Sequence, residues 1–313
     1  MVKEDFKLSD EQNSYIYENI IKPELFAGGK VYNDQPTALY LGAQPGSGKT
    51  ALSRFLDQRV DRSKTVVINN DELRNHHPEY RKLMDHPTEF AKAPVMVNAD
   101  STIWLQRVFQ DAIKNNYNII FDSTLGSKNI TGFTDAMKLL KEKYQYQIEL
   151  HILAVKPELS KMGIHLRYES QVQSDGKGRF VEMSTHDLNF SMLQPNIEKI
   201  LKDVAIDHIS TYTRLIGFEN GQIKNNSVDQ LMGINRPTSS DFTKIKESIN
   251  NEWQRPLTDN EKTYFKFRFD QVVGMISKRG GDLAQFKNDV RDLTRYNIEK
   301  LDFAKLSNSG PKI

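Results

Sequence analysis

The sequence predicts an α/β fold in which a mainly parallel β-sheet lies between two layers of helices. Short apolar runs alternate along the chain with longer stretches of helical periodicity, which is typical of a parallel sheet covered on both faces. A Gly-rich loop follows the first apolar run, where a strand should give way to a helix. The composition is compatible with a sizeable core, because hydrophobic residues make up 38% of the 313 residues and aromatic residues 10%.

Charge and amino-acid usage exclude several classes of protein. Lys and Arg number 43 against 41 Asp and Glu, a net charge of +2, so the chain as a whole is no strongly basic nucleic-acid binder. Cysteine is absent, which excludes disulfides and thiolate metal sites. The apolar runs are far shorter than the roughly 18 residues that span a membrane, and the N-terminus lacks the apolar core of a signal peptide. We expect a cytoplasmic protein without a nucleic-acid or membrane partner.

In the first half of the chain, the sequence predicts strands that alternate with helices. A capping-box pattern at Ser9 and Gln12 indicates a first helix. Four apolar runs then predict buried strands, and the stretches between them have helical periodicity. The strands are expected at 38–41, 65–68, 118–121 and 148–155, and the helices at 51–60, 100–114 and 135–144.

The last third of the chain has a different pattern. Residues 210–226 alternate weakly around Asn220-Gly221, the strongest hairpin signal in the sequence. No strand candidate follows Pro237, whereas a second capping box at Thr258 and Glu261 opens a helix. We therefore predict an α/β domain over residues 1–236 and a helical C-terminal region over residues 237–313.

The Gly-rich loop is the most specific signal in the chain. Gly42 to Thr50 reads Gly-Ala-Gln-Pro-Gly-Ser-Gly-Lys-Thr, a Walker A pattern in which Ala43 replaces the first glycine. Its glycines let backbone N–H groups curl around a phosphate, the lysine reaches the β and γ oxygens, and the threonine hydroxyl can ligate Mg²⁺. The alternative is a Gly-rich turn that serves packing only. The residues predicted to bind ATP are Ala43, Gln44, Pro45, Gly46, Ser47, Gly48, Lys49 and Thr50.

Two carboxylates follow predicted strands at the edge of the sheet that faces this loop. Asp71 follows the second strand, where a general base for a substrate hydroxyl would lie, although an N-cap aspartate is the alternative. Asp122 follows the third strand, where it could contact Mg²⁺-bound water or be a plain turn residue. Position alone does not choose between these roles.

Two arginines flank a polar segment that contains two glycines. Arg167 and Arg179 enclose residues 170–178. Arginines inserted into a site stabilise the charge on a transferring γ-phosphate, so the segment is predicted to be a lid. A solvated basic loop is the competing interpretation.

Six segments in order resemble the zeta toxin family, the kinases of bacterial epsilon/zeta toxin–antitoxin systems. The resemblance extends from the first helix to about Ser227 and implies a P-loop kinase fold. It also implies transfer of phosphate from ATP, with Mg²⁺, to the 3′-hydroxyl on the amino sugar of UDP-N-acetylglucosamine, a product that poisons peptidoglycan synthesis. The segments are 41–50, 68–71 followed by His77-Pro78, 120–124, 154–158, 163–169, and Arg179 followed by His186-Asp187.

The resemblance implies roles for single residues. Asp71 matches the family's general base, and Thr124 matches a threonine that contacts substrate. Arg167 and Arg179 match the arginines that stabilise the transferring phosphate. Lys49 and Thr50 match the phosphate and Mg²⁺ residues. A small helical antitoxin that blocks the ATP site is implied as a partner.

Two departures from the family pattern lie on the substrate side. The third-strand motif has Asp122 where the family usually has glutamate, and its nearest following cation is Lys128. Gln106 stands where the family carries a substrate-side glutamate. Both positions remain candidate substrate contacts. Because the departures lie on the substrate side, the resemblance supports phosphoryl transfer more strongly than it supports the identity of the acceptor.

Two other functions are compatible with the sequence. The chain could be a P-loop kinase of another small molecule, such as an antibiotic or a nucleotide. It could also be a regulatory protein that binds ATP without transferring phosphate. The set of Asp71, Arg167 and Arg179 disfavours the regulatory protein, because a pure binder needs no base opposite the phosphates. The C-terminal helices could be core, a docking surface or a built-in inhibitor.

Overall fold

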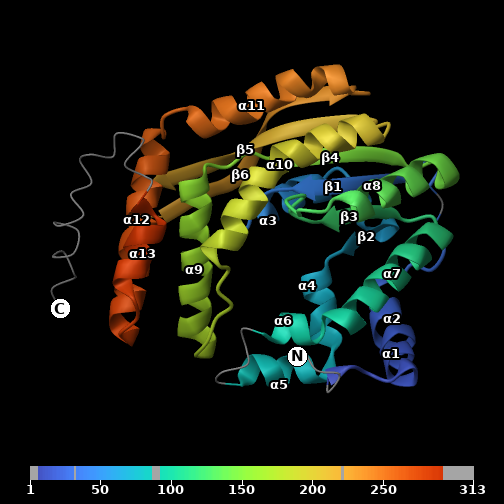
Figure 1. The fold of residues 1–313 in the computed structure, drawn as a ribbon, viewed down its shortest axis with the longest axis horizontal. Helices are drawn as coiled ribbons and strands as arrows, with labels where there is room; N and C mark the ends of the chain where they lie inside the picture. Colours follow the sequence, from blue (N-terminus) through green and yellow to red (C-terminus); the bar gives the residue numbers. More distant parts are fainter. Residues whose placement is uncertain (1–5, 32, 87–91, 220–221, 292–313) are drawn as a thin grey trace.

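A six-stranded sheet with the order β2-β3-β1-β4-β5-β6 forms the centre of the molecule (Figure 1). The computed structural model describes residues 6–31, 33–86, 92–219 and 222–291. Strands β1 to β5 are parallel, and β6 pairs antiparallel with β5. The strands are β1 (Thr37–Gly42), β2 (Thr65–Ile68), β3 (Asn118–Asp122), β4 (Gln147–Leu153), β5 (His208–Glu219) and β6 (Gln222–Asn235). The predicted mainly parallel sheet is confirmed.

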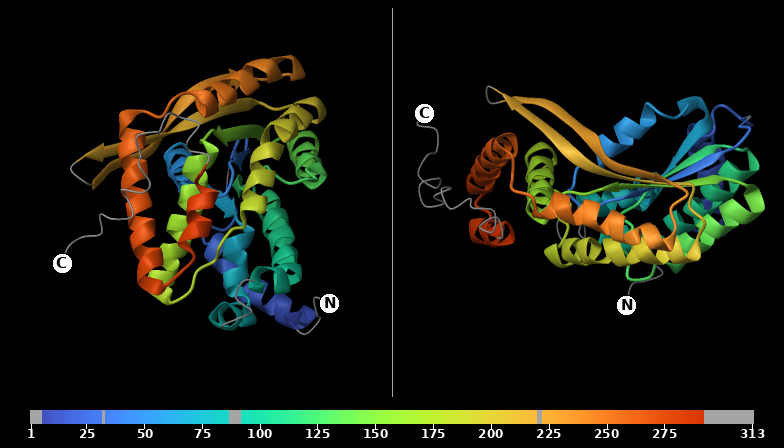
Figure 2. Two further views of the ribbon diagram at one scale, coloured as in Figure 1. Left: turned by 60° about the vertical axis from the view of Figure 1, so that its left-hand side comes forward. Right: turned by 90° about the horizontal axis from the view of Figure 1, so that it is seen from above.

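Helices cover both faces of the sheet, and β1 shows why (Figure 2). Ala38 and Tyr40 are buried in one apolar cluster, whereas Leu39 and Leu41 are buried in another. Because successive side chains of a strand point to opposite faces, each face needs its own cover. The first face is covered by α1 (Asp10–Ile16), η2 (Tyr17–Ile21), α2 (Lys22–Leu25), α7 (Asn98–Lys114), α8 (Thr131–Lys138), η5 (Leu139–Lys143), α10 (Met183–Asp203) and α11 (Phe242–Gln254). The second is covered by α3 (Lys49–Asp57), α9 (Pro157–Asp175), α12 (Asp259–Arg279) and α13 (Leu283–Asp289).

Short helices at both edges of the sheet complete the fold. Those between β2 and α7 lie at the carboxyl ends of the strands, where Tyr80, Leu83, Ala93 and Val97 form a small separate apolar cluster. The elements are η3 (Arg62–Lys64), α4 (Asn70–Leu73), η4 (Arg74–His76), α5 (Pro78–Asp85), α6 (Ala93–Met96) and η6 (Ser239–Asp241). None of the helices in the described ranges combines the length and the apolar character that crossing a membrane requires.

Local signals set several boundaries as predicted. The Ser9 hydroxyl accepts a hydrogen bond from the Gln12 N–H while the Gln12 side chain accepts from the Ser9 N–H, which completes the first capping box. The same reciprocal pair forms between Thr258 and Glu261 at the start of α12. The hairpin is longer than predicted, since β5 and β6 pair from His208 opposite Asn235. The predicted turn at Asn220-Gly221 lies outside the described residues.

The predicted lid is wrong in its first part. Helix α9 continues to Asp175, so residues 170–175 are helical and only 176–182 form a loop. The polar sequence conceals this helix because its partners come from elsewhere. Glu169, which is buried, accepts hydrogen bonds of 2.6 and 2.7 Å from Arg279 at the end of α12.

The C-terminal helices contact the same core as the sheet. Phe265 and Phe269 of α12 are buried in the cluster that contains Leu39 and Leu41 of β1. Figures 1 and 2 both show α12 alongside α9. The buried Lys156, which follows β4, donates to the carbonyl oxygens of residues 252, 253 and 255 at the end of α11, over 2.6, 3.2 and 2.5 Å. The division of the chain near Pro237 stays a prediction.

Candidate active site

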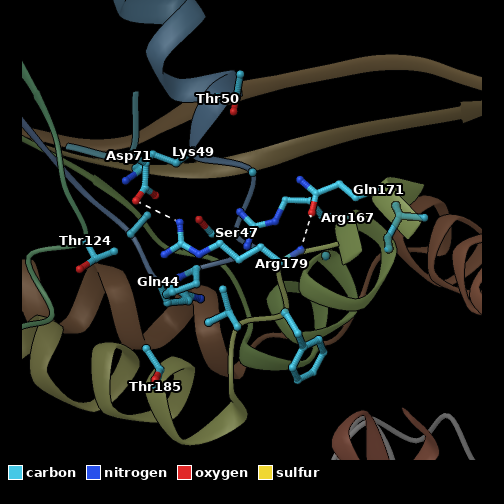
Figure 3. Close-up of a pocket in the computed structure, with 18 of the residues that line it drawn as sticks. Gln44, Ser47, Lys49, Thr50, Asp71, Thr124, Arg167, Gln171, Arg179 and Thr185 are labelled. Carbon is cyan, nitrogen blue, oxygen red and sulfur yellow. Dashed lines mark hydrogen bonds and ion pairs between the residues drawn. The ribbon is translucent and has the colours of Figure 1, made fainter. Parts of the chain in front are cut away.

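A cavity of about 1470 Å³ opens at the carboxyl ends of β1, β2 and β3 (Figure 3). This is the edge at which ligands bind in open α/β sheets. The phosphate loop, α9, α10, β5 and α12 all contribute residues to its wall. Thirteen predicted site residues line it, namely the eight residues Ala43 to Thr50 together with Asp71, Asp122, Thr124, Arg167 and Arg179.

Gln106 is the predicted site residue that the structure does not bring to the cavity. It is exposed on α7 and is not among the residues that line the cavity. Trp104 and Val108, on either side of it, are fully buried against the sheet. Since residues two apart lie on opposite sides of a helix, Gln106 must face away from the core. Gln106 therefore lies outside the wall of this cavity, and its expected substrate contact stays a prediction without support from this structure.

The phosphate loop has the backbone that its glycines predict. Gly46 and Gly48 have φ angles of 78° and 84°, in the left-handed region that favours glycine. A Cβ atom on Gly46 would lie 2.0 Å from the carbonyl oxygen of Ser160, so α9 packs directly on the loop. Gly48 is also the N-cap of α3, which directs the start of that helix toward the cavity. This geometry is suited to holding phosphate oxygens.

A polar chain of the buried Gln44, Ser160 and His186, ending at the exposed Asp187, fixes the loop from behind. The Gln44 side-chain amide donates to the Val155 carbonyl over 2.6 Å and to the Ser160 hydroxyl over 3.2 Å. Ser160 in turn lies 2.7 Å from His186 Nε2, and His186 Nδ1 lies 2.8 Å from Asp187. Burial is the main cause that lowers the pKa of His186, so its neutral form is favoured at neutral pH. The chain ties the loop to α9 and α10.

Lys49 and Asp122 form an ion pair at the floor of the cavity. Lys49 Nζ lies 2.7 Å from Asp122 Oδ1 and donates to the Ser123 carbonyl over 2.7 Å. The second oxygen of Asp122 accepts from the Asn69 side chain over 3.0 Å. Thr124, two residues further on, also lines the cavity. The ends of β2 and β3 and the phosphate loop are thus connected by one polar cluster.

The structure excludes one of the two roles considered for Asp71, the helix N-cap. The N-cap of α4 is Asn69, whose side-chain oxygen accepts from the Asp71 N–H over 2.9 Å. The carboxylate of Asp71 therefore does not cap the helix. It pairs instead with the guanidinium groups of Arg74 and, over 3.1 Å, Arg179 (Figure 3).

Positive charge dominates the electrostatics around Asp71. Burial would raise the pKa of its carboxyl, but three arginines outweigh that effect and hold the pKa below its usual value. They are Arg179, Arg74 and Arg167. Burial and the neighbouring Arg179 charge also lower the pKa of the Arg167 guanidinium. Two arginines held this close to each other favour an anionic ligand between them.

The loop at 176–182 reaches across the cavity. Lys177 forms an ion pair with Asp85 of α5, and Arg179 pairs with Asp71 of α4. The Arg179 N–H donates to the Gln171 side chain over 3.0 Å, which anchors the loop to α9. The sequence indicated the two arginines, but Arg74 of the same ion-pair cluster carries no motif and was missed.

Three other residues that line the cavity carry no sequence signal. Arg214 lies on β5, and Tyr264 and Arg268 lie on α12. They follow the phosphate loop by more than 160 residues. No spacing rule connects positions so far apart, so only a structure could find them.

The cavity fits a nucleotide with its Mg²⁺. The loop geometry and Lys49 suit the phosphates, and the hydroxyl-bearing Thr50 is exposed and lines the cavity. The described residues contain no group of three or more His, Asp or Glu side chains placed to hold a metal ion. Nucleotide-bound Mg²⁺ takes most of its ligands from phosphates and water, so a single protein hydroxyl is a sufficient anchor.

Known proteins share this sequence pattern and this fold. The family model described as zeta toxin matches residues 26–227. Toxin PezT of Streptococcus pneumoniae is 29% identical over 188 residues, covering 59% of this chain and 72% of that protein. Toxin zeta of Enterococcus hirae is 26% identical over 203 residues, covering 64% and 68%.

A solved structure supports the fold. A chain from the PezAT chromosomal toxin–antitoxin system of Streptococcus pneumoniae has a TM-score of 0.64, at 20% identity, over 86% of this chain and 99% of that chain. At this level of identity the likeness shows the fold alone.

Proposed function

Because the chain belongs to the zeta toxin family, we propose that it is an ATP-dependent kinase that phosphorylates a hydroxyl of a nucleotide sugar. The observation that carries the proposal is the Asp71 carboxylate in the same cavity as the phosphate loop, paired with Arg179. A protein that only binds ATP has no use for a carboxylate and two arginines at that place.

The proposed reaction is a single phosphoryl transfer. The acceptor hydroxyl oxygen forms a bond to the γ-phosphorus of ATP as the bond from that phosphorus to the β,γ-bridging oxygen breaks, and ADP leaves. The hydroxyl proton passes to the Asp71 carboxylate, which its arginine neighbours keep ionised at neutral pH. Mg²⁺, held by the Thr50 hydroxyl, would neutralise charge on the phosphates.

Arg179 has two partners in this proposal. In the present structure it neutralises Asp71. A γ-phosphate bound by Lys49 would compete for the same guanidinium, and Arg167 would provide a second positive charge. Any shift of Arg179 toward the phosphate would raise the pKa of Asp71 and make it a stronger base. The base would then be activated only when the donor is bound.

We propose the 3′-hydroxyl on the amino sugar of UDP-N-acetylglucosamine as the acceptor. The support is family membership together with Asp122 and Thr124 on the acceptor side of the cavity. The names of the relatives further support a toxin that is controlled by a separate antitoxin. Both proposed substrates are cytoplasmic metabolites, so the reaction would take place in the cytoplasm.

The test is an incubation with ATP labelled on the γ-phosphate and a panel of UDP-sugars, followed by mass analysis. We expect a phosphorylated product from UDP-N-acetylglucosamine and none from its 3′-deoxy analogue. If another UDP-sugar alone gives a phosphorylated product, the protein is still a kinase, but its acceptor is that other sugar. Loss of ATP without any labelled nucleotide sugar would contradict the proposed function.

A further inference from the structure

A row of cationic and aromatic side chains lines the cavity on the far side of the phosphate loop from Asp71. Arg214 comes from β5, and Tyr264 and Arg268 come from α12. The two α12 positions lie beyond residues 26–227, the part of the chain that the family model matches. The mechanism above gives none of the three a role.

Tyr264 contacts both arginines, and Arg214 also rests against the phosphate loop. A Cβ atom on Gly48 would lie 3.2 Å from Arg214 Nε, so this guanidinium rests against the phosphate loop. Arg214 Nη2 donates to the Tyr264 hydroxyl over 3.2 Å, and its Cζ lies 5.4 Å from the centre of that ring. Arg268 Cζ lies 5.3 Å from the centre of the same ring. Tyr264, only 6% exposed, thus holds two guanidinium groups in the cavity wall.

The sheet order determines which part of a nucleotide would meet this row. Asp71 follows β2 and Asp122 follows β3, and both strands lie on one side of β1. Strand β5, with Arg214, lies on the other side of β1, beyond β4. In an in-line transfer the acceptor and the rest of the donor lie on opposite sides of the moving phosphoryl group. With the γ-phosphate directed toward Asp71, the nucleoside end extends toward β5 and α12.

We infer that Arg214 and Arg268, held by Tyr264, form the subsite for the nucleoside end of the donor nucleotide. Arg214, against Gly48, would contact the α-phosphate. Arg268, one helical turn along from Tyr264, would stack its planar guanidinium on the base. This inference rests on the proposed function, because it takes the direction of the nucleotide from the position of Asp71. It makes a C-terminal helix part of the ATP site.

The test compares ATP with inorganic tripolyphosphate, which carries the phosphates without a nucleoside. Binding of both to the full chain is measured by titration calorimetry. Arg268→Gln should weaken ATP binding by about 5- to 150-fold, the range for loss of one stacking contact, and leave tripolyphosphate binding unchanged. Retained tripolyphosphate binding also shows that the variant is folded. The matched control is Lys266→Gln, which removes an exposed charge from the same helix, paired with Asp270 over 2.9 Å, and should change neither affinity.

The outcomes separate the inference from the proposed function. ATP binding by Arg268→Gln at the affinity of the unaltered protein would overturn the inference. An equal loss of affinity for ATP and for tripolyphosphate would also overturn it, since Arg268 would then act on the phosphates or on the fold. Failure of the proposed function has another signature, namely no labelled product from any UDP-sugar, whatever the ATP affinity of Arg268→Gln. Tyr264→Phe, which keeps the ring but loses the hydroxyl contact to Arg214, should weaken ATP binding less than Arg268→Gln does.

Discussion

The guanidinium of Arg179 donates to the carboxylate of Asp71 over 3.1 Å, although the two residues are 108 positions apart in the chain. The contact joins the loop after α9 to the first turn of α4 across the mouth of the cavity. It couples the proposed base to the proposed stabiliser of the phosphoryl group. The first two predictions below concern this pair.

Asp71→Asn should separate catalysis from folding. The substitution keeps the size and removes the base, so phosphoryl transfer should fall by roughly 10²–10⁴-fold. ATP affinity should change little and the variant should stay folded, with a modestly lower melting temperature, because Asn69 and not Asp71 caps α4 and only the ion pairs with Arg74 and Arg179 are lost. Turnover, calorimetric ATP affinity and thermal unfolding of the one variant check this. Asp61→Asn, at the exposed N-cap of η3, is the control and should leave transfer intact. Normal turnover in folded Asp71→Asn would refute the proposed mechanism.

Arg179→Gln should move the acid limb of the pH–rate profile. Arg179 is the largest cause that lowers the pKa of the Asp71 carboxyl, so its removal raises that pKa. If Asp71 must be ionised, the acid limb of kcat/KM shifts to higher pH. The lowered pKa of Asp71 also affects how the stability of the fold depends on pH. A depressed carboxyl pKa stabilises the fold above its unfolded value, and this stability is lost as the pH falls through the folded pKa.

The measurements for Arg179→Gln are kcat/KM and urea unfolding across the acidic range. The variant should lose less stability on acidification than the unaltered protein does, because less of its stability depends on the ionised Asp71. An acid limb that stays in place would show that Asp71 is not the titrating base.

Lys49→Ala should weaken ATP binding by roughly 10- to 100-fold, since hydrogen bonds to charged groups contribute about 1.5–3 kcal/mol. Lys49 begins α3 and points to the end of β3, where it pairs with Asp122. Calorimetry with ATP checks the prediction, and Lys64→Ala, on η3 outside the cavity, is a control of equal charge. Retention of full ATP affinity would mean that the loop does not bind the phosphates.

Truncation after Asn235 tests the predicted division near Pro237. It would remove Phe265 and Phe269 from the core cluster that they share with β1. Loss of one large aromatic side chain from a core costs about 3–5 kcal/mol, a large part of the ~5–15 kcal/mol that stabilise a typical domain. It would also remove the three backbone carbonyl oxygens that accept hydrogen bonds from the ammonium group of Lys156, a side chain that is only 1% exposed. We expect the shortened chain not to fold stably, as measured by circular dichroism and thermal unfolding.

A truncated chain that melts at the temperature of the full chain would show that residues 1–236 are an independent unit. In that case ATP binding by the fragment would measure what α12 adds to the site. The expected loss of folding would instead assign the C-terminal helices to the kinase core.

The sequence by itself determined the features that depend on a few neighbouring residues. Ser9 with Gln12 and Thr258 with Glu261 mark helix starts because a capping box is complete within four positions. Gly48 and Lys49 indicate a phosphate loop because the backbone conformation and the following helix are both local. The alternation of apolar runs and helical stretches was sufficient to predict a sheet between two layers of helices, since each element must bury its own apolar face.

The tertiary structure decided whatever depends on partners distant in the chain. Residues 170–175 were predicted as part of a lid, but they continue α9, whose buried Glu169 is paired with Arg279, 110 residues later. Gln106 matched a family position by spacing, but the packing of Trp104 turns it away from the cavity. Arg214 reaches the phosphate loop from β5, and Arg268 joins the same cavity only because α12 packs beside α9. Such contacts leave no trace in local sequence, because the free energy that forms them comes from burial of whole helix faces and not from any short motif.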